Sequence, residues 1–212
     1  MYVPPIFKVH HAVALAFAAT RGFGLVVACE GGRPVASLLP FLVTEQDGEV
    51  PRVHFHVARG NPLAALAEKN GTWLIAVAGH DAYVSPDWYA TKDQVPTWLY
   101  EAVQLAGPVR VVPADHTAAH LDRLAAKFEA WHAPKPPWTA EQVSPARRAT
   151  LTNAIVAIEM TVEAVEGSFK LNQAKSDIDF AATVRGLRQQ DDPAARAIAA
   201  RMVALRPHLS YE

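Results

Sequence analysis

Two histidines spaced two residues apart are the first candidates for chemistry in this sequence. His54 and His56 lie in the run VHFHV, and residues at this spacing in a strand share one face. A structural zinc site needs about four ligands and a catalytic one about three, yet no carboxylate or cysteine accompanies the pair in sequence. We therefore predict hydrogen-bonded histidines, in a site or in the core, and no metal.

Aromatic rings and hydrogen-bonding groups gather in two other stretches. One holds YVSPDWY and VPTWLY, between Tyr83 and Tyr100, and the other is FKLNQ at 169–173. A planar, partly apolar ligand with a phosphate tail needs flat aromatic walls, a few donors and a cation. Arg59 and Asn61, at the start of an expected helix, bring a guanidinium close to backbone N–H groups that favour an anion. The pattern indicates a ligand site, with a simple aromatic core as the alternative.

The elements that must position these residues are short strands and a few helices. Strands are expected at 24–29, 35–43, 53–58 and 73–78, which are short runs rich in branched residues between turn signals. Further strands are expected at about 98–112 and at 155–165, where apolar and polar residues alternate in the second of these. Helices are expected at 11–19, from Pro62 with Asn61 as N-cap, and at 115–131, 176–187 and 192–205. Residues 81–94 are expected to be a long loop. Regular short strands with tight turns predict an α+β protein built on an antiparallel barrel or sheet.

Composition limits the partners and the compartment. The chain has 212 residues, half of them hydrophobic, and a net charge of −1. Its single cysteine, Cys29, lies in an apolar run, so we expect an inert core residue and a reducing cytoplasm. No apolar run is long enough to span a membrane, and the first residues do not resemble a signal peptide. From Ser144 onward the sequence contains nine Lys/Arg and eight Asp/Glu residues. This balance of charge gives no support for a DNA-binding surface.

A family resemblance joins these separate signals. The segments MYVPPIFKV, HVARGNP, AYVSPDWY, VPTW and KLNQ occur in this order along nearly the whole chain. Together they resemble the PaiB-like FMN-binding negative transcriptional regulators, which are similar in fold to pyridoxamine-phosphate oxidases. The resemblance implies an FMN-binding split β-barrel with peripheral helices, at residues 1–175, and a helical C-terminal extension at 176–212. It also implies a homodimer with FMN sites at the subunit interface.

Carried over residue by residue, the resemblance implies three groups of cofactor-binding residues. The phosphate and ribityl side of FMN would meet His56, Arg59 and Asn61. The rest of the pocket would be lined by Ser37, Ser85, Trp88, Tyr89, Thr97 and Trp98. Lys170 and Gln173 would reach the cofactor from the partner subunit. For the two tryptophans, packing at the interface is the alternative.

Three functions remain open at this stage. The chain could be an FMN-binding protein with flavin-dependent redox or sensing activity, a DNA-binding repressor, or a dimeric scaffold that has lost its cofactor. The last is considered because Ser37, Leu99 and Gln104 differ from residues common in the family. No catalytic residue is predicted, since a flavin carries the redox step itself. We expect direct DNA binding to be weak or absent, because the last expected helix is mostly alanine.

Overall fold

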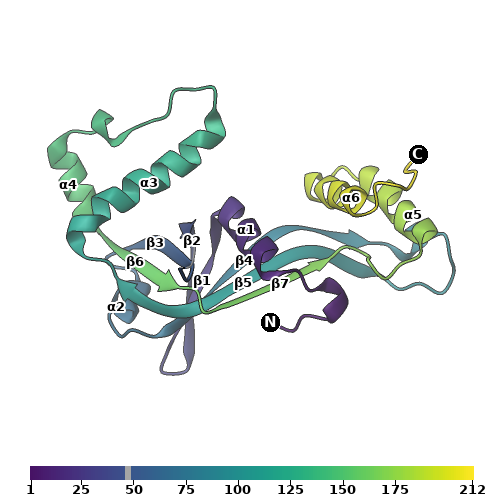
Figure 1. The fold of residues 1–212 in the computed structure, drawn as a ribbon, viewed down its shortest axis with the longest axis horizontal. Coiled ribbons are helices and arrows are strands. Elements are labelled where there is room, and N and C mark those ends of the chain that lie inside the picture. The colour runs from purple at the N-terminus through teal and green to yellow at the C-terminus, as the bar shows by residue number, and fades with distance from the viewer. Residues whose placement is uncertain (46–48) are drawn as a thin grey trace. The chain divides into compact units, whose positions relative to one another are not determined.

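The computed structural model describes residues 1–45 and 49–212. The strands of this part of the chain are β1 (Phe23–Glu30), β2 (Arg33–Thr44), β3 (Arg52–Ala58), β4 (Thr72–Val84), β5 (Thr97–Val111), β6 (Ile155–Thr161) and β7 (Ala164–Lys170). The α-helices are α1 (His11–Arg21), α2 (Pro62–Ala67), α3 (Thr117–Glu129), α4 (Pro145–Asn153), α5 (Asp177–Arg188) and α6 (Pro193–Leu205). Figure 1 shows the course of the chain through these elements.

The strands form one sheet in the order β4-β1-β2-β3-β6-β5-β7, with a further pairing between β4 and β5. That pairing joins the ends of the run from β4 to β5, as in a β-barrel. The β1–β2, β1–β4, β2–β3, β3–β6 and β5–β6 pairs are antiparallel. The structure is therefore the expected α+β fold on an antiparallel barrel-like sheet.

Contacts divide the chain into two compact units. The barrel unit comprises residues 16–77 and 104–165, and the terminal unit comprises 1–15, 78–103 and 166–212. The core of the barrel unit includes the fully buried Phe41, Phe55, Ile75, Ile158 and Met160. The core of the terminal unit includes the fully buried Leu99, Leu171, Phe180, Leu187 and Ile198.

The helix caps follow the local sequence closely. The side chain of Asn61 accepts a hydrogen bond from the backbone of Leu63, so α2 begins where Asn-Pro predicted it. Ser176 and Asp192 cap α5 and α6 in the same way. No helix among the described residues combines the length and apolar character needed to cross a membrane.

Several predicted bounds were wrong. Residues 81–94 were expected to be a loop, but β4 continues to Val84 and includes the first four of them. A short 3₁₀ turn follows at Pro86–Trp88. The expected strand at 155–165 ends at Thr161, and β7 begins separately at Ala164. Helix α4 was not predicted, although Ser144 caps it and Pro145 begins it. That Ser-Pro pair was the available signal.

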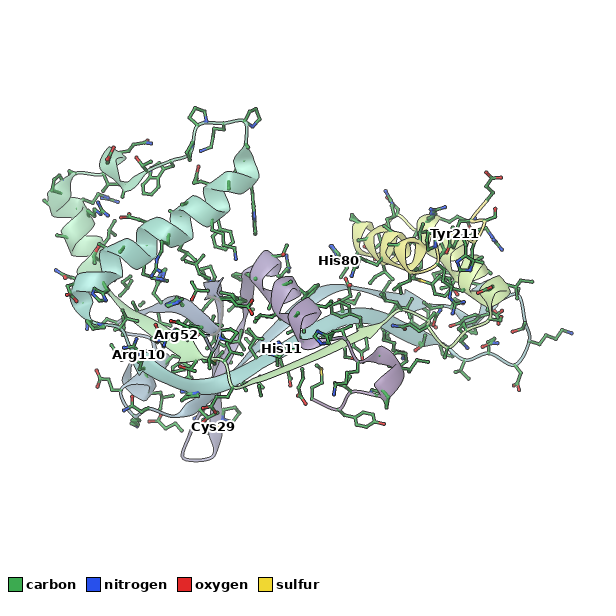
Figure 2. The ribbon with its side chains drawn as sticks, in the orientation of Figure 1. His11, Cys29, Arg52, His80, Arg110 and Tyr211 are labelled. Carbon is green, nitrogen blue, oxygen red and sulfur yellow. The ribbon has the colours of Figure 1, made fainter. Side chains whose placement is uncertain are left out.

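Cys29 is exposed, which corrects the expectation of a core residue. It lies near the end of β1 in the β1–β2 hairpin (Figure 2). Gly24, Val26 and Ala28 of β1 are buried, whereas Leu25 on the opposite face is exposed. Both faces of this strand are apolar, so composition could not tell the inner face from the outer one.

Candidate functional site

Ser37 and Asn61 meet within the barrel unit. The Asn61 amide donates to Ser37 Oγ at 3.0 Å, while its oxygen accepts from the backbone N–H of Leu63 at 3.0 Å. Ser37 lies opposite the fully buried Val26 across the β1–β2 pair, so it is on the inner face of β2. Both side chains are half-buried. The contact ties the start of α2 to the sheet and brings two predicted site residues together.

Arg59 follows directly after β3 and is exposed. Its Nε donates to the carbonyl of Asn153 and its Nη2 to the carbonyl of Ile155, each at 3.0 Å. The guanidinium therefore holds the junction between α4 and β6. Its third nitrogen, Nη1, makes no hydrogen bond to any residue that the structure describes. Arg59 thus has a structural role together with one free donor group.

His56 pairs with a residue that sequence reasoning missed, His120 of α3. His56 Nδ1 and His120 Nε2 are 3.1 Å apart, and the two rings meet edge to face. His120 is only 2% exposed. Burial, followed by the proximity of His56 and His54, lowers the pKa of His120 to about 4. Burial also lowers the pKa of His56. Both rings are therefore neutral at neutral pH, and one N–H donates to the other nitrogen.

His54 has partners of its own on the same face of β3. Its Nε2 shares a hydrogen bond of 2.9 Å with Thr44 Oγ1, and its Nδ1 lies 3.7 Å from Glu159 Oε2. Burial lowers the pKa of His54, and Glu159 offsets only part of that effect. Across the described residues, no group of three or more histidine, cysteine or acidic side chains could hold a metal ion.

In the terminal unit, Thr97 and Lys170 are brought together. Lys170 Nζ donates to Thr97 Oγ1 at 2.7 Å and lies 5.9 Å from the centre of the Phe7 ring. Next to Thr97, the indole of Trp98 is 54% exposed and meets Tyr83 edge to face at 6.0 Å. A cation, a hydroxyl and an exposed aromatic pair thus occur in the same unit.

The remaining predicted residues are occupied by packing and turn formation. Ser85 caps the 3₁₀ turn, and Trp88 packs on α5, where a Cβ added to Gly186 would lie 2.5 Å from the indole. Tyr89 is buried, with its hydroxyl 3.5 Å from Asn172. The Gln173 side chain accepts from the N–H of Leu171 and donates to the carbonyl of Phe169. A role in ligand binding stays a prediction for all four predicted site residues.

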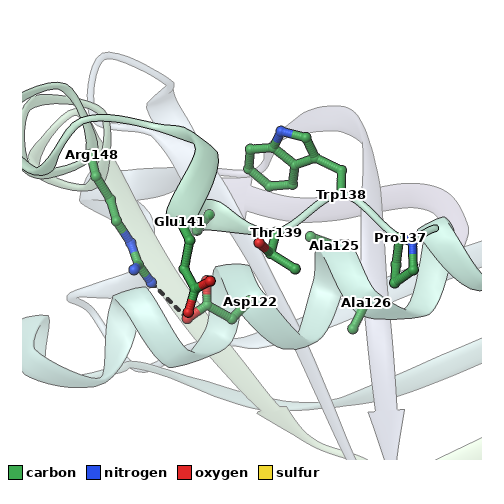
Figure 3. Close-up of a pocket in the computed structure, with 9 residues that line it drawn as sticks. Asp122, Ala125, Ala126, Pro137, Trp138, Thr139, Glu141 and Arg148 are labelled. Atoms are coloured by element: carbon green, nitrogen blue, oxygen red, sulfur yellow. Dashed lines mark hydrogen bonds and ion pairs between the residues drawn. The ribbon is translucent and has the colours of Figure 1, made fainter.

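Among the described residues, the barrel unit contains cavities of about 270, 470 and 330 Å³, and none of these is lined by the predicted site residues. One of about 270 Å³ lies between α3 and the segment 137–148, beside the ion pair of Asp122 and Arg148 (Figure 3). The other two, of about 470 and 330 Å³, share His54 and Arg123.

Comparison with known proteins places this geometry in context. Residues 1–164 match the family described as "Putative FMN-binding domain". Over 200 residues the chain is 30% identical to "Protease synthase and sporulation protein PAI 2" of Bacillus subtilis (strain 168), covering 94% of this chain and 95% of that protein.

Two solved structures share the fold. The FAD and heme binding protein from Mycobacterium smegmatis has a TM-score of 0.57 at 18% identity, over 83% of this chain and 80% of that one. The flavocytochrome Anf3 from Azotobacter vinelandii has a TM-score of 0.54 at 14% identity, over 77% and 69%. These similarities confirm the predicted split-barrel fold.

Proposed function

The chain belongs to the PaiB-like family of FMN-binding domains, and from this premise we propose that it binds FMN as a dimeric flavoprotein. The observation that carries the proposal is the family match over residues 1–164, together with a relative that is similar over 94% of the chain. The redox chemistry would be supplied by FMN itself. The protein would bind the phosphate, fix the orientation of the ring and limit the access of water.

The chemical groups that FMN requires are present. The free Nη1 of Arg59 and the ammonium of Lys170 are cations that suit a phosphate or the polar edge of a flavin. Lys170 uses one donor on Thr97 and keeps others for a ligand. The exposed indole of Trp98 offers a flat apolar surface for a ring. This donor set is compatible with FMN.

An apolar surface on the barrel unit supports the homodimer. Phe23 and Leu25 of β1 and Leu38 of β2 are 41%, 38% and 63% exposed. Leu25 and Leu38 are directly opposite each other in the sheet, so their side chains share one face. Burying such a face is favourable, and we propose that a second copy covers it. In this dimer Lys170 and Gln173 of one protomer would contact the FMN of its partner. Sedimentation as a monomer at micromolar concentration would contradict this.

Direct DNA reading by the last two helices has little support. Helix α6 buries Ala195, Ile198, Ala199 and Met202, and α5 and α6 lie side by side (Figure 1). Three arginines nearby are paired with carboxylates: Arg196 with Asp191, Arg201 with Glu101 and Arg206 with Asp177. We infer that any regulatory effect is indirect, through the flavin or a partner.

A lysine variant tests the cofactor proposal. We expect Lys170→Met to lower the affinity for FMN about tenfold or more, because a charge-assisted contact is lost. Lys69→Met is the matched control, since Lys69 is an exposed lysine that pairs with Glu30, and it should bind FMN like the parent. Fluorescence titration of the three proteins measures this. If Lys170→Met and Lys69→Met bind FMN equally well, Lys170 is not part of the site.

A further inference from the structure

A basic cavity lies in the barrel unit between helix α3 and the outer face of β3, β5 and β6. Its volume is about 470 Å³. The residues that line it are His54, Arg110, Val112, Pro113, His116, Ala119, Arg123 and Glu159. A second cavity of about 330 Å³ shares His54 and Arg123 with it and adds Arg52 and Glu49 among its walls.

Strand pairing explains why these charges gather. Glu159 of β6 lies directly opposite His54 of β3 on one side and Arg110 of β5 on the other. Residues paired in this way project from the same face of a sheet. Arg52 lies two residues before His54 and therefore shares that face. Figure 2 shows Arg52 and Arg110 near each other at the barrel strands.

The buried carboxylate of Glu159 accepts hydrogen bonds from two of the three arginines at these cavities, Arg52 and Arg110. Glu159 Oε1 accepts from Arg52 Nη1 and from Arg110 Nε, both at 2.8 Å. The side chain of Glu159 is 8% exposed, whereas those of Arg52 and Arg110 are 42% and 56% exposed. Burial alone would raise the pKa of Glu159, but the two arginines more than offset it and hold the pKa below its usual value. Glu159 is therefore ionised, and both arginines keep donors that face solvent.

Arg123 is the unmatched cation of the cluster. It lines both cavities, and it makes no hydrogen bond or ion pair with residues 1–45 or 49–212. Arg52, Arg110 and Arg123 together carry three positive charges against the single charge of Glu159. The exposed Glu49 adds one negative charge at the second cavity, so the described residues that line the two cavities carry three positive charges against two negative ones. Guanidinium forks match the oxygens of a phosphate group, and a partly enclosed cavity strengthens the attraction.

We propose that this cavity is a second anion site, which binds the phosphate group of a small ligand through Arg123 and Arg110, with Arg52 adding a positive charge at the adjoining cavity. None of the residues predicted for FMN lines it, so it would be occupied together with the flavin. Inorganic phosphate would fill only a part of the 470 Å³. A phosphate monoester with a small organic body therefore fits the space better than the free ion.

Calorimetric titration in a phosphate-free buffer at constant ionic strength tests the proposal. The probes are inorganic phosphate and ribose 5-phosphate, added to the FMN-loaded protein and to the protein without flavin. We expect the parent protein to bind both probes saturably and to bind ribose 5-phosphate more tightly than inorganic phosphate. In Arg123→Ala the affinity for both probes should be about tenfold or more lower. Arg147→Ala removes the same charge from the exposed surface of α4 and should bind like the parent. Unchanged thermal unfolding of both variants confirms that they are folded.

Two results would overturn this proposal. The first is no saturable binding of either probe, or equal binding by Arg123→Ala and Arg147→Ala. The second is an Arg123→Ala variant that loses affinity for FMN but not for riboflavin, because the cavity would then hold the FMN phosphate itself. In that case the proposed function, FMN binding by the parent protein, would still stand, and only the proposal of a second anion site would be wrong.

Discussion

We predict that the contact between the half-buried His56 and the buried His120 makes the folded protein sensitive to acid. A histidine in an unfolded chain has a pKa near 6.5, whereas burial lowers the pKa of His120 to about 4. Since the folded pKa is below the unfolded one, the contribution of neutral His120 is complete above pH 6.5 and is lost as the pH falls toward 4. At pH 5 the solution is about 1.5 pH units below the histidine pKa of the unfolded chain, which corresponds to a loss of about 2 kcal/mol in the free energy of unfolding. Solvent screening reduces the expected loss to about 1–2 kcal/mol.

Urea unfolding at pH 7.5 and pH 5.0 measures this loss in the parent and in His120→Gln. Glutamine keeps a nitrogen close to the position of Nε2 but does not titrate. We expect the free energy of unfolding of the parent to fall about 1–2 kcal/mol further than that of the variant. His116→Gln is the matched control, because His116 is exposed one turn before His120, and it should keep the parent's pH dependence. Equal pH dependence of the parent and His120→Gln would refute the reasoning.

Three further predictions concern packing, the cofactor and DNA. Gly186→Ala should lower the free energy of unfolding by about 1–3 kcal/mol despite the better helix propensity of alanine, because the new Cβ would lie 2.5 Å from the indole of Trp88; a more stable variant would contradict that packing. Arg59→Ala should weaken FMN about tenfold but leave riboflavin unchanged, and parent-like FMN affinity in a titration would remove Arg59 from the site. In gel-shift assays at physiological salt the protein should not form a sequence-specific complex, and nanomolar binding to a defined operator would overturn that prediction.

The sequence predicted what depends on neighbouring residues. Asn61 and Ser176 correctly predicted the starts of α2 and α5, because a cap is a contact between residues two or three positions apart. Alternation gave strand β6 but not its burial. Glu159 is one of the polar residues in that alternation, yet it is buried, because Arg52 and Arg110 reach it from two other strands. No local pattern contains those pairings.

The same limit applies to the candidate site. His56 was identified from its spacing, but its partner His120 is 64 residues away in α3 and becomes a neighbour only in the fold. Arg59 was expected near a phosphate, and the carbonyls that two of its nitrogens bind belong to α4 and β6. The contact between Lys170 and Thr97 likewise joins β7 to the start of β5. Sequence motifs thus identified the candidate site residues, whereas the contacts that each side chain makes depend on the tertiary structure.

The visible absorption spectrum of the purified protein, titrated with FMN, tests the central claim most directly. We predict flavin bands that remain with the protein after gel filtration and saturate at one FMN per subunit, with riboflavin retained much less well. A colourless protein that also rejects added FMN would contradict flavin binding and would favour a dimeric scaffold that has lost its cofactor.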